Sequence, residues 1–180
     1  MQMRTIIACI LISAATGLAA STDQVYQTRA AFIRENFADQ APPASTLWLN
    51  PQLRAELKAV LGRSPSLRMR YWERSGRTLW ILNEIGKVRP ITTGVVVAND
   101  KIESIRVLVF RESRGWEVRY DFFTNQFVDA RLNEQDQFTQ PIDGITGATL
   151  SVRAMKRMAK AALILHEHAT ETQDLLAKAN

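Results

Sequence analysis

Residues 143–155, with the sequence DGITGATLSVRAM, combine residue types that suit the binding of an anion. Gly144 and Gly147 alternate with the hydroxyl residues Thr146 and Thr149, and a pattern with helical spacing follows at once. The first backbone N–H groups of a helix have no partner within the helix, and the helix dipole favours negative charge there. Glycines allow successive N–H groups to converge on one point. A phosphate group is therefore the natural ligand of this segment.

The same residue types also occur in helix caps that bind no ligand. A threonine or serine side chain can accept a hydrogen bond from the first helical turn and so satisfy a free N–H group locally. The spacing of the residues alone leaves both interpretations open.

A motif comparison favours the phosphate interpretation. The segment has an aspartate, then after two residues a threonine, and then Gly-Ala-Thr. It resembles the flavinylation motif of FMN-binding domain proteins, which also occurs in the C subunit of sodium-pumping NADH–quinone reductases and in the G subunit of Rnf complexes. In that family a flavin transferase, with FAD as donor, esterifies the last threonine to the FMN phosphate. The resemblance implies covalent FMN on Thr149 and a surrounding binding turn of Asp143, Gly144, Thr146, Gly147, Ala148 and Leu150.

A second segment, VLVFRESRGWEVRYDFFTNQFVDARL, resembles the part of small exported FMN-binding domain proteins that reaches the flavin. The two resemblances together extend over roughly residues 91–168. They imply a loop beside the isoalloxazine ring, formed by Glu112, Ser113, Arg114, Gly115 and Trp116. Trp116 would pack on the ring, and Arg114 would stabilise negative charge on the reduced flavin. The alternative is a tight turn with a core tryptophan and a solvated arginine.

The elements that must position these residues can be predicted from periodicity. Helical spacing predicts a first helix over residues 23–37, and the prolines of QAPPAS end it. Asn50 as N-cap, Pro51 at the first helical position and Gly62 after the end predict a second helix. Alternating and β-branched residues predict strands over residues 67–74, 78–85, 91–98 and 102–110, with hairpin turns at SGR and NDK.

The last predicted element is a helix from about Leu150 to His168. Its apolar positions, Val152, Met155, Ala159, Ala162 and Leu163, share one face that should pack on the sheet. Consecutive strands with short turns imply an antiparallel meander. The predicted fold class is therefore α+β, an antiparallel sheet with flanking helices of the FMN-binding domain type.

The N-terminus predicts export. One basic residue, an apolar run and the small residues near Ala19–Ser21 are typical of a signal peptide. We expect a signal peptide over residues 1–20, a helical segment over 21–66, the FMN-binding domain over 67–170 and a tail over 171–180. Removing the leader lowers the formal net charge of +5 by one and removes Cys9, the only cysteine. A chain without cysteine cannot carry a cysteine-ligated iron–sulfur cluster or a c-type haem.

These features predict an exported, periplasmic electron carrier rather than an enzyme. Its expected partners are a flavin transferase for maturation and membrane or periplasmic redox proteins, and not nucleic acid. A flavin-dependent reductase of a small substrate and a non-redox anion-binding or ligand-binding module stay open as alternatives. We predict no metal site, because His166 and His168 are two residues apart and would point to nearly opposite sides of a helix.

Overall fold

The computed structural model describes residues 23–178, with side chains described through residue 172. The predicted signal peptide and Cys9 lie outside the described residues. The strands are β1 (Gln24–Val25), β2 (Ser45–Trp48), β3 (Arg68–Arg74), β4 (Arg77–Ile85), β5 (Pro90–Ala98) and β6 (Lys101–Phe110). The helices are α1 (Arg29–Asn36), α2 (Pro51–Leu61), α3 (Asp121–Thr124) and α4 (Thr149–Lys178), with 3-10 helices η1 (Trp116–Arg119) and η2 (Asn125–Phe127).

The six strands form one antiparallel sheet in the order β1-β6-β5-β4-β3-β2. The four predicted strands are confirmed to within one residue at each end, and they form the predicted meander from β3 to β6. With its helices the sheet confirms the α+β fold class. The short edge strands β1 and β2 were not predicted.

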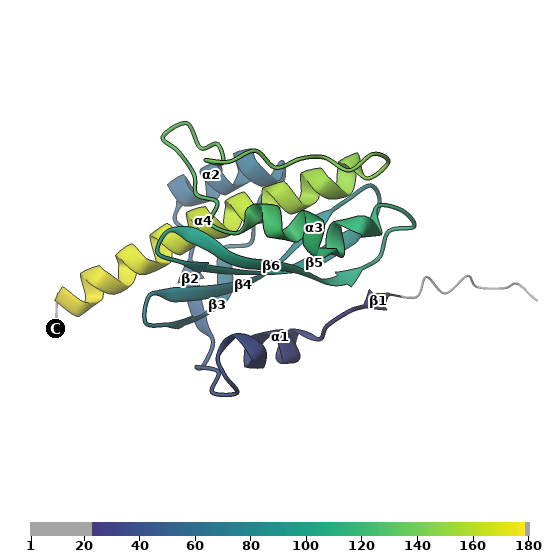
Figure 1. Ribbon diagram of the computed structural model, residues 1–180. Helices are drawn as coiled ribbons and strands as arrows, with labels where there is room; N and C mark the ends of the chain where they lie inside the picture. Colours follow the sequence, from purple (N-terminus) through teal and green to yellow (C-terminus); the bar gives the residue numbers. More distant parts are fainter. Residues whose placement is uncertain (1–22, 179–180) are drawn as a thin grey trace, which may run out of the picture.

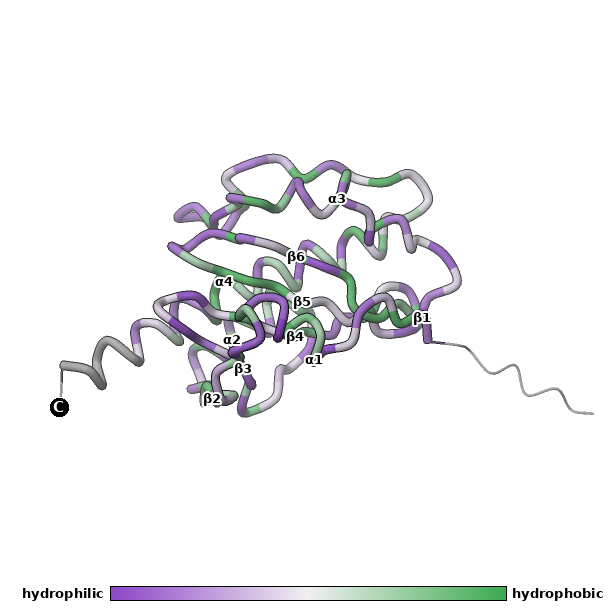
Figure 2. The backbone as a smooth tube through the Cα atoms, turned by 60° about the horizontal axis from the view of Figure 1, so that its bottom comes forward, coloured by the Kyte–Doolittle hydropathy of each residue, from purple (hydrophilic) through white to green (hydrophobic). Residues whose placement is uncertain are grey.

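Helices cover both faces of the sheet. Helices α2 and α4 lie on one face and α1 lies on the other (Figure 1). Strand β5 therefore has a continuous buried run from Ile91 to Val97, and Figure 2 shows green, hydrophobic segments close to the label β5. A strand that is buried on both faces has mainly apolar or small residues at successive positions, and here the run also includes the buried Thr92 and Thr93.

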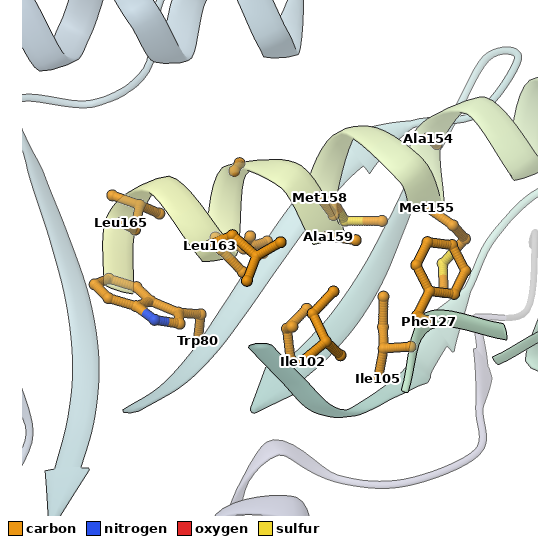
Figure 3. Close-up of a cluster of buried hydrophobic side chains, with 14 of the residues drawn as sticks. Trp80, Ile102, Ile105, Phe127, Ala154, Met155, Met158, Ala159, Leu163 and Leu165 are labelled. Carbon is orange, nitrogen blue, oxygen red and sulfur yellow. The ribbon is translucent and has the colours of Figure 1, made fainter. Parts of the chain in front are cut away.

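Helix α4 fixes the position of the anion-binding turn relative to the sheet. The predicted apolar stripe is buried, and Met155, Met158, Ala159 and Leu163 point toward Ile102, Ile105 and Trp80 of the sheet (Figure 3). On the charged side, Arg157 pairs with the buried Glu84 of β4 at 3.3 Å. These contacts hold the first turn of α4 in a fixed place at one end of the sheet.

Two helix boundaries differ from the prediction. The predicted helix over residues 23–37 is wrong at its start, because Gln24 and Val25 pair with β6. The side chain of Thr28 then caps α1 by accepting a hydrogen bond from Ala31 N at 3.1 Å. The predicted end of the last helix at about His168 is also wrong, because α4 continues to Lys178. No glycine or proline follows His168 in the sequence to stop it.

Helix α4 is long, but charged and polar residues interrupt its apolar positions. Among residues 23–178, no helix combines the length and the apolar character that crossing a membrane requires.

Candidate functional site

The segment before α4 forms a tight turn. The Ala148 N–H donates to the Ile145 carbonyl oxygen at 3.0 Å, which closes a four-residue turn. Gly147, third in the turn, has a φ of 82°, in the left-handed region that favours glycine. Thr146 and Gly147 are exposed, and the chain enters the helix at the exposed Thr149. The turn thus presents the Thr149 side chain at the protein surface.

The first turn of α4 has no side-chain cap among the described residues. Ala148 occupies the cap position, since its carbonyl accepts the first helical bond, from Val152 N at 2.9 Å. Its methyl side chain has no acceptor atom. The N–H groups of Thr149, Leu150 and Ser151 consequently have no acceptor within the part of the chain that the structure describes. The structure therefore does not have the threonine or serine cap of the alternative interpretation. Free N–H donors remain at the start of α4 for an anion.

Three side chains outside the turn hold the segment that leads into it. Gln126 accepts a hydrogen bond from Asp143 N at 2.6 Å, and Lys156 Nζ donates to the Ile142 carbonyl at 2.5 Å. Gln140 donates to the Gln126 carbonyl at 2.5 Å and so ties the segment to η2. The Asp143 carboxylate itself is exposed and has no hydrogen bond to the described residues. It is accessible to a protein that reads this segment.

Thr149 borders two surface hollows. One, of about 280 Å³, is lined by Lys87, Glu112, Arg114 and residues 147–151. The other, of about 560 Å³, is lined by residues 144–146, Thr149, Val152, Arg153 and Lys156. Each hollow therefore has two cationic side chains in its lining, and Thr149 lines both hollows. Their charge and the free N–H groups of α4 both favour a negatively charged ligand.

The predicted ring-contacting loop is held against the first turn of α4. Gly115 is buried with a φ of 83°, and a Cβ atom placed there would lie 2.4 Å from Ser151 Oγ. Only glycine allows this approach, so the loop and the turn are in direct contact. The sequence analysis placed Gly115 in the loop beside the flavin ring, and in the structure its backbone closely approaches Ser151.

Glu112 has a structural partner of its own. Its Oε1 atom accepts hydrogen bonds from the N–H groups of Lys87, Val88 (2.7 Å) and Arg89 (2.8 Å) in the β4–β5 turn. Partial burial raises the pKa of Glu112, but these three backbone hydrogen bonds and the nearby charge of Lys87 outweigh it, so the pKa is lowered. The ionised carboxylate holds Lys87 beside the smaller hollow.

The remaining loop residues divide into two groups. Arg114 is exposed and lines the smaller hollow. Ser113 and Trp116 line neither hollow. Trp116 is 38% exposed, lies edge-on to Tyr120 at 5.6 Å between ring centroids, and has the Arg119 guanidinium 5.3 Å from its own ring. It is neither a core tryptophan nor part of the hollows beside Thr149.

Three cationic residues of this site were missed by the sequence analysis. Arg153 and Lys156 follow Thr149 by four and seven positions, and this helical spacing was a usable signal. Lys87 lies 62 residues before Thr149, and no pattern in the sequence joins the two. Among the described residues, no group of three or more His, Cys, Asp or Glu side chains could hold a metal ion.

Comparison with known proteins adds an independent finding. Residues 86–164 match the family model of the FMN-binding domain. The match begins at the turn between β4 and β5 and ends within α4, so it includes the Glu112 loop, the turn and Thr149. No curated protein and no solved structure matches the chain.

Proposed function

We propose that the chain is a flavin-binding protein, and more specifically an exported electron carrier with FMN attached through Thr149, since residues 86–164 match the family model of the FMN-binding domain. One observation carries the proposal. The exposed Thr149 stands at a helix start where Ala148 provides no cap and where three N–H groups have no acceptor among the described residues. A phosphate ester on the Thr149 hydroxyl would bring its own oxygens to those donors.

The residues present fit a flavin phosphate. Lys87 and Arg114 line one side of Thr149, and Arg153 and Lys156 line the other. Cations on both sides of the ester would offset the charge of the phosphodiester. Trp116 is an exposed aromatic residue that follows Gly115. We continue to predict that it packs against the isoalloxazine ring.

The attachment reaction needs only FAD and a flavin transferase. The Thr149 oxygen forms a bond to the FMN phosphorus, the phosphoanhydride bond of FAD breaks, and AMP leaves. The hydroxyl proton passes to solvent or to a base of the transferase, and no electrons are transferred. The exposed Asp143 carboxylate and the glycine turn are the features that we expect the transferase to recognise.

The bound flavin would accept two electrons and pass them on one at a time. The ester bond to Thr149 would prevent loss of the flavin outside the cytoplasm, where free FMN is scarce. The site lies at the surface, so a redox partner could approach it. This setting favours a carrier, since an enzyme needs a concave site that excludes water.

The attachment is tested by intact mass. Co-expressed with a flavin transferase and exported, the protein should gain the mass of FMN less one water and should fluoresce in a denaturing gel. Thr149→Ala should abolish this covalent flavin completely, whereas Thr149→Ser should retain part of it because serine keeps the hydroxyl. Covalent flavin on the alanine variant would place the acceptor elsewhere.

The carrier role is tested separately on the flavinylated protein. With NADH and a small quinone such as menadione as the only reactants, we expect negligible turnover. Rapid and saturable reduction of the quinone would favour the reductase alternative.

A further inference from the structure

A further hollow of the described residues lies apart from the two beside Thr149. Its lining residues come from α1, from the end of α2 and the loop that follows it, and from β3 and β4, whereas α1 itself contacts β5. Helix α1 has only eight residues, too few to cover a six-stranded sheet. We call this hollow the α1 groove. It shares no lining residue with the hollows beside Thr149.

Apolar side chains line much of the α1 groove. The apolar lining residues include Ile33 of α1, Trp72 and Ile81 of the sheet, and Pro65 and Met69. Ile33, Trp72 and Ile81 all pack against the core cluster on the α1 face of the sheet. The volume is about 700 Å³. Hollows of roughly 300–1,000 Å³ with mainly apolar linings are typical of sites for small molecules.

The charged residues that line the α1 groove are all basic. The lining has four arginines, Arg29, Arg63, Arg68 and Arg70, and no acidic residue. Arg63 is held in place, because it pairs with the buried Glu84 at 3.3 Å and donates to the Asn83 carbonyl at 2.6 Å. Within residues 23–172, Arg29, Arg68 and Arg70 have no carboxylate partner. Three guanidinium groups without counter-ions beside an apolar lining therefore favour an anionic ligand.

We propose that the α1 groove binds a soluble amphipathic anion of small-molecule size. Its apolar or aromatic body lies on Trp72 and Ile81, and its carboxylate, sulfonate or phosphate head contacts Arg68 and Arg70. The planar guanidinium group binds such oxyanions through two parallel hydrogen bonds. The lining includes residues of α1 and also Arg63, Pro65 and Ser66 of the loop after α2, and a hollow of about 700 Å³ suits a compact ligand better than a flat membrane surface.

A matched pair of probes tests the proposal. Naphthalene-2-carboxylate and the neutral naphthalene-2-carboxamide have the same apolar body and differ in charge. Isothermal titration of the flavinylated protein should show saturable binding of the carboxylate and at least tenfold weaker binding of the amide. The Trp72 indole signal should shift in the nuclear magnetic resonance spectrum during the carboxylate titration.

Variants locate the site. The double substitution Arg68→Gln and Arg70→Gln should weaken carboxylate binding at least tenfold, which corresponds to about 1.4 kcal/mol. The control, Arg34→Gln with Arg131→Gln, removes the same charge from exposed arginines outside the groove and should leave the affinity unchanged. Circular dichroism would establish that both variants are folded.

Three outcomes would overturn the proposal. Equal affinity for the carboxylate and the amide would make the groove an apolar surface without anion selectivity. Unchanged binding in the Arg68 and Arg70 double variant would place the carboxylate elsewhere. Binding to vesicles that contain anionic lipid, with no binding of the soluble carboxylate, would make this face a membrane contact.

Discussion

Helices α2 and α4 lie side by side on the same face of the sheet, but they begin in different ways. The Asn50 side chain accepts a hydrogen bond from Leu53 N at 2.8 Å at the start of α2, and Pro51 removes one donor. Helix α4 begins after Ala148, which has no side-chain acceptor. The start of α2 is thus satisfied by its own sequence, whereas that of α4 leaves donors for a ligand.

The two helix starts on this sheet face differ in role, since that of α2 contributes to stability and that of α4 is available for binding. Both helices contribute buried side chains to the same core cluster, so packing does not distinguish them. An N-cap adds about 1 kcal/mol to the stability of a helix. Helix α4, long and deeply packed, forms without this contribution. We interpret the uncapped start as the feature that makes α4 a binding element.

The largest stability effect is expected at the glycine that brings the loop onto α4. In Gly115→Ala the new Cβ atom would collide with Ser151 and the residue would keep a positive φ, so we expect a loss of about 2 kcal/mol or more. Gly62→Ala, at the end of α2, is the control. It also has a positive φ, but its Cβ would be 3.8 Å from the Arg157 side chain, so we expect about 1 kcal/mol.

Urea unfolding measures both free energies, and the yield of covalent flavin measures the effect on the site. Only Gly115→Ala should lower that yield, because it displaces the first turn of α4. Equal costs for the two variants would mean that the loop moves away from Ser151 without resistance.

The difference between the two helix starts could be predicted only in part from the sequence. Asn50, Pro51 and Gly62 are local signals, and they predicted α2 correctly because each acts on its own neighbours in the chain. The turn before α4 was also located correctly. Its lack of a cap was not predicted, since Thr146 and Thr149 are cap-forming types and only the geometry shows that Ala148 occupies the cap position.

Other features were missed because no local pattern encodes them. Strand β1 has two residues and β2 has four, too few for a periodicity, and both exist because they add to a sheet edge. The segment η1–α3–η2 consists of very short helices that pack by Val118, Phe123 and Phe127 rather than by propensity. Lys87 reaches the site through the hydrogen bonds of Glu112, a contact between residues 25 positions apart.

The next largest effects on the free energy of unfolding are expected from substitutions at the two cap positions. These effects should have opposite signs at α2 and α4. Asn50→Ala should lower the free energy of unfolding by about 1 kcal/mol and leave flavin attachment unchanged. Ala148→Ser adds an acceptor for the free N–H groups and should raise the free energy of unfolding of the unmodified protein by up to about 1 kcal/mol.

Inorganic phosphate is a simple probe of the same comparison. Amide signals of Leu150 and Ser151 in the unmodified protein should shift with added phosphate, and Ala148→Ser should weaken this response because the serine oxygen competes for the donors. Loss of stability in Ala148→Ser, with an unchanged phosphate response, would argue against free donors at the start of α4.

The smallest effect concerns the far part of α4, where a titratable group is buried instead of exposed. His166 is 2% exposed, and its Nδ1 atom lies 2.7 Å from Thr78 Oγ1. The Trp80 indole donates to the same hydroxyl at 2.9 Å, so the hydroxyl proton is free to be donated to Nδ1 of a neutral imidazole. Burial lowers the pKa of His166, and the attraction of Asp100, 3.6 Å away, offsets this only in part.

The pH dependence of the free energy of unfolding follows from this lowered pKa of His166. The unfolded chain binds a proton at His166 below about pH 6.5, whereas the folded protein does so only at lower pH. Stability from this residue is therefore complete above pH 6.5 and declines as the pH falls, by at most about 1.4 kcal/mol per pH unit. Urea unfolding from pH 7.5 to 5 measures the decline, and His166→Gln should remove the part that His166 contributes. An identical profile in the variant would mean that other groups carry the pH dependence. Flavin on Thr149 should not alter this part of the profile, because the two residues are 17 positions apart on α4.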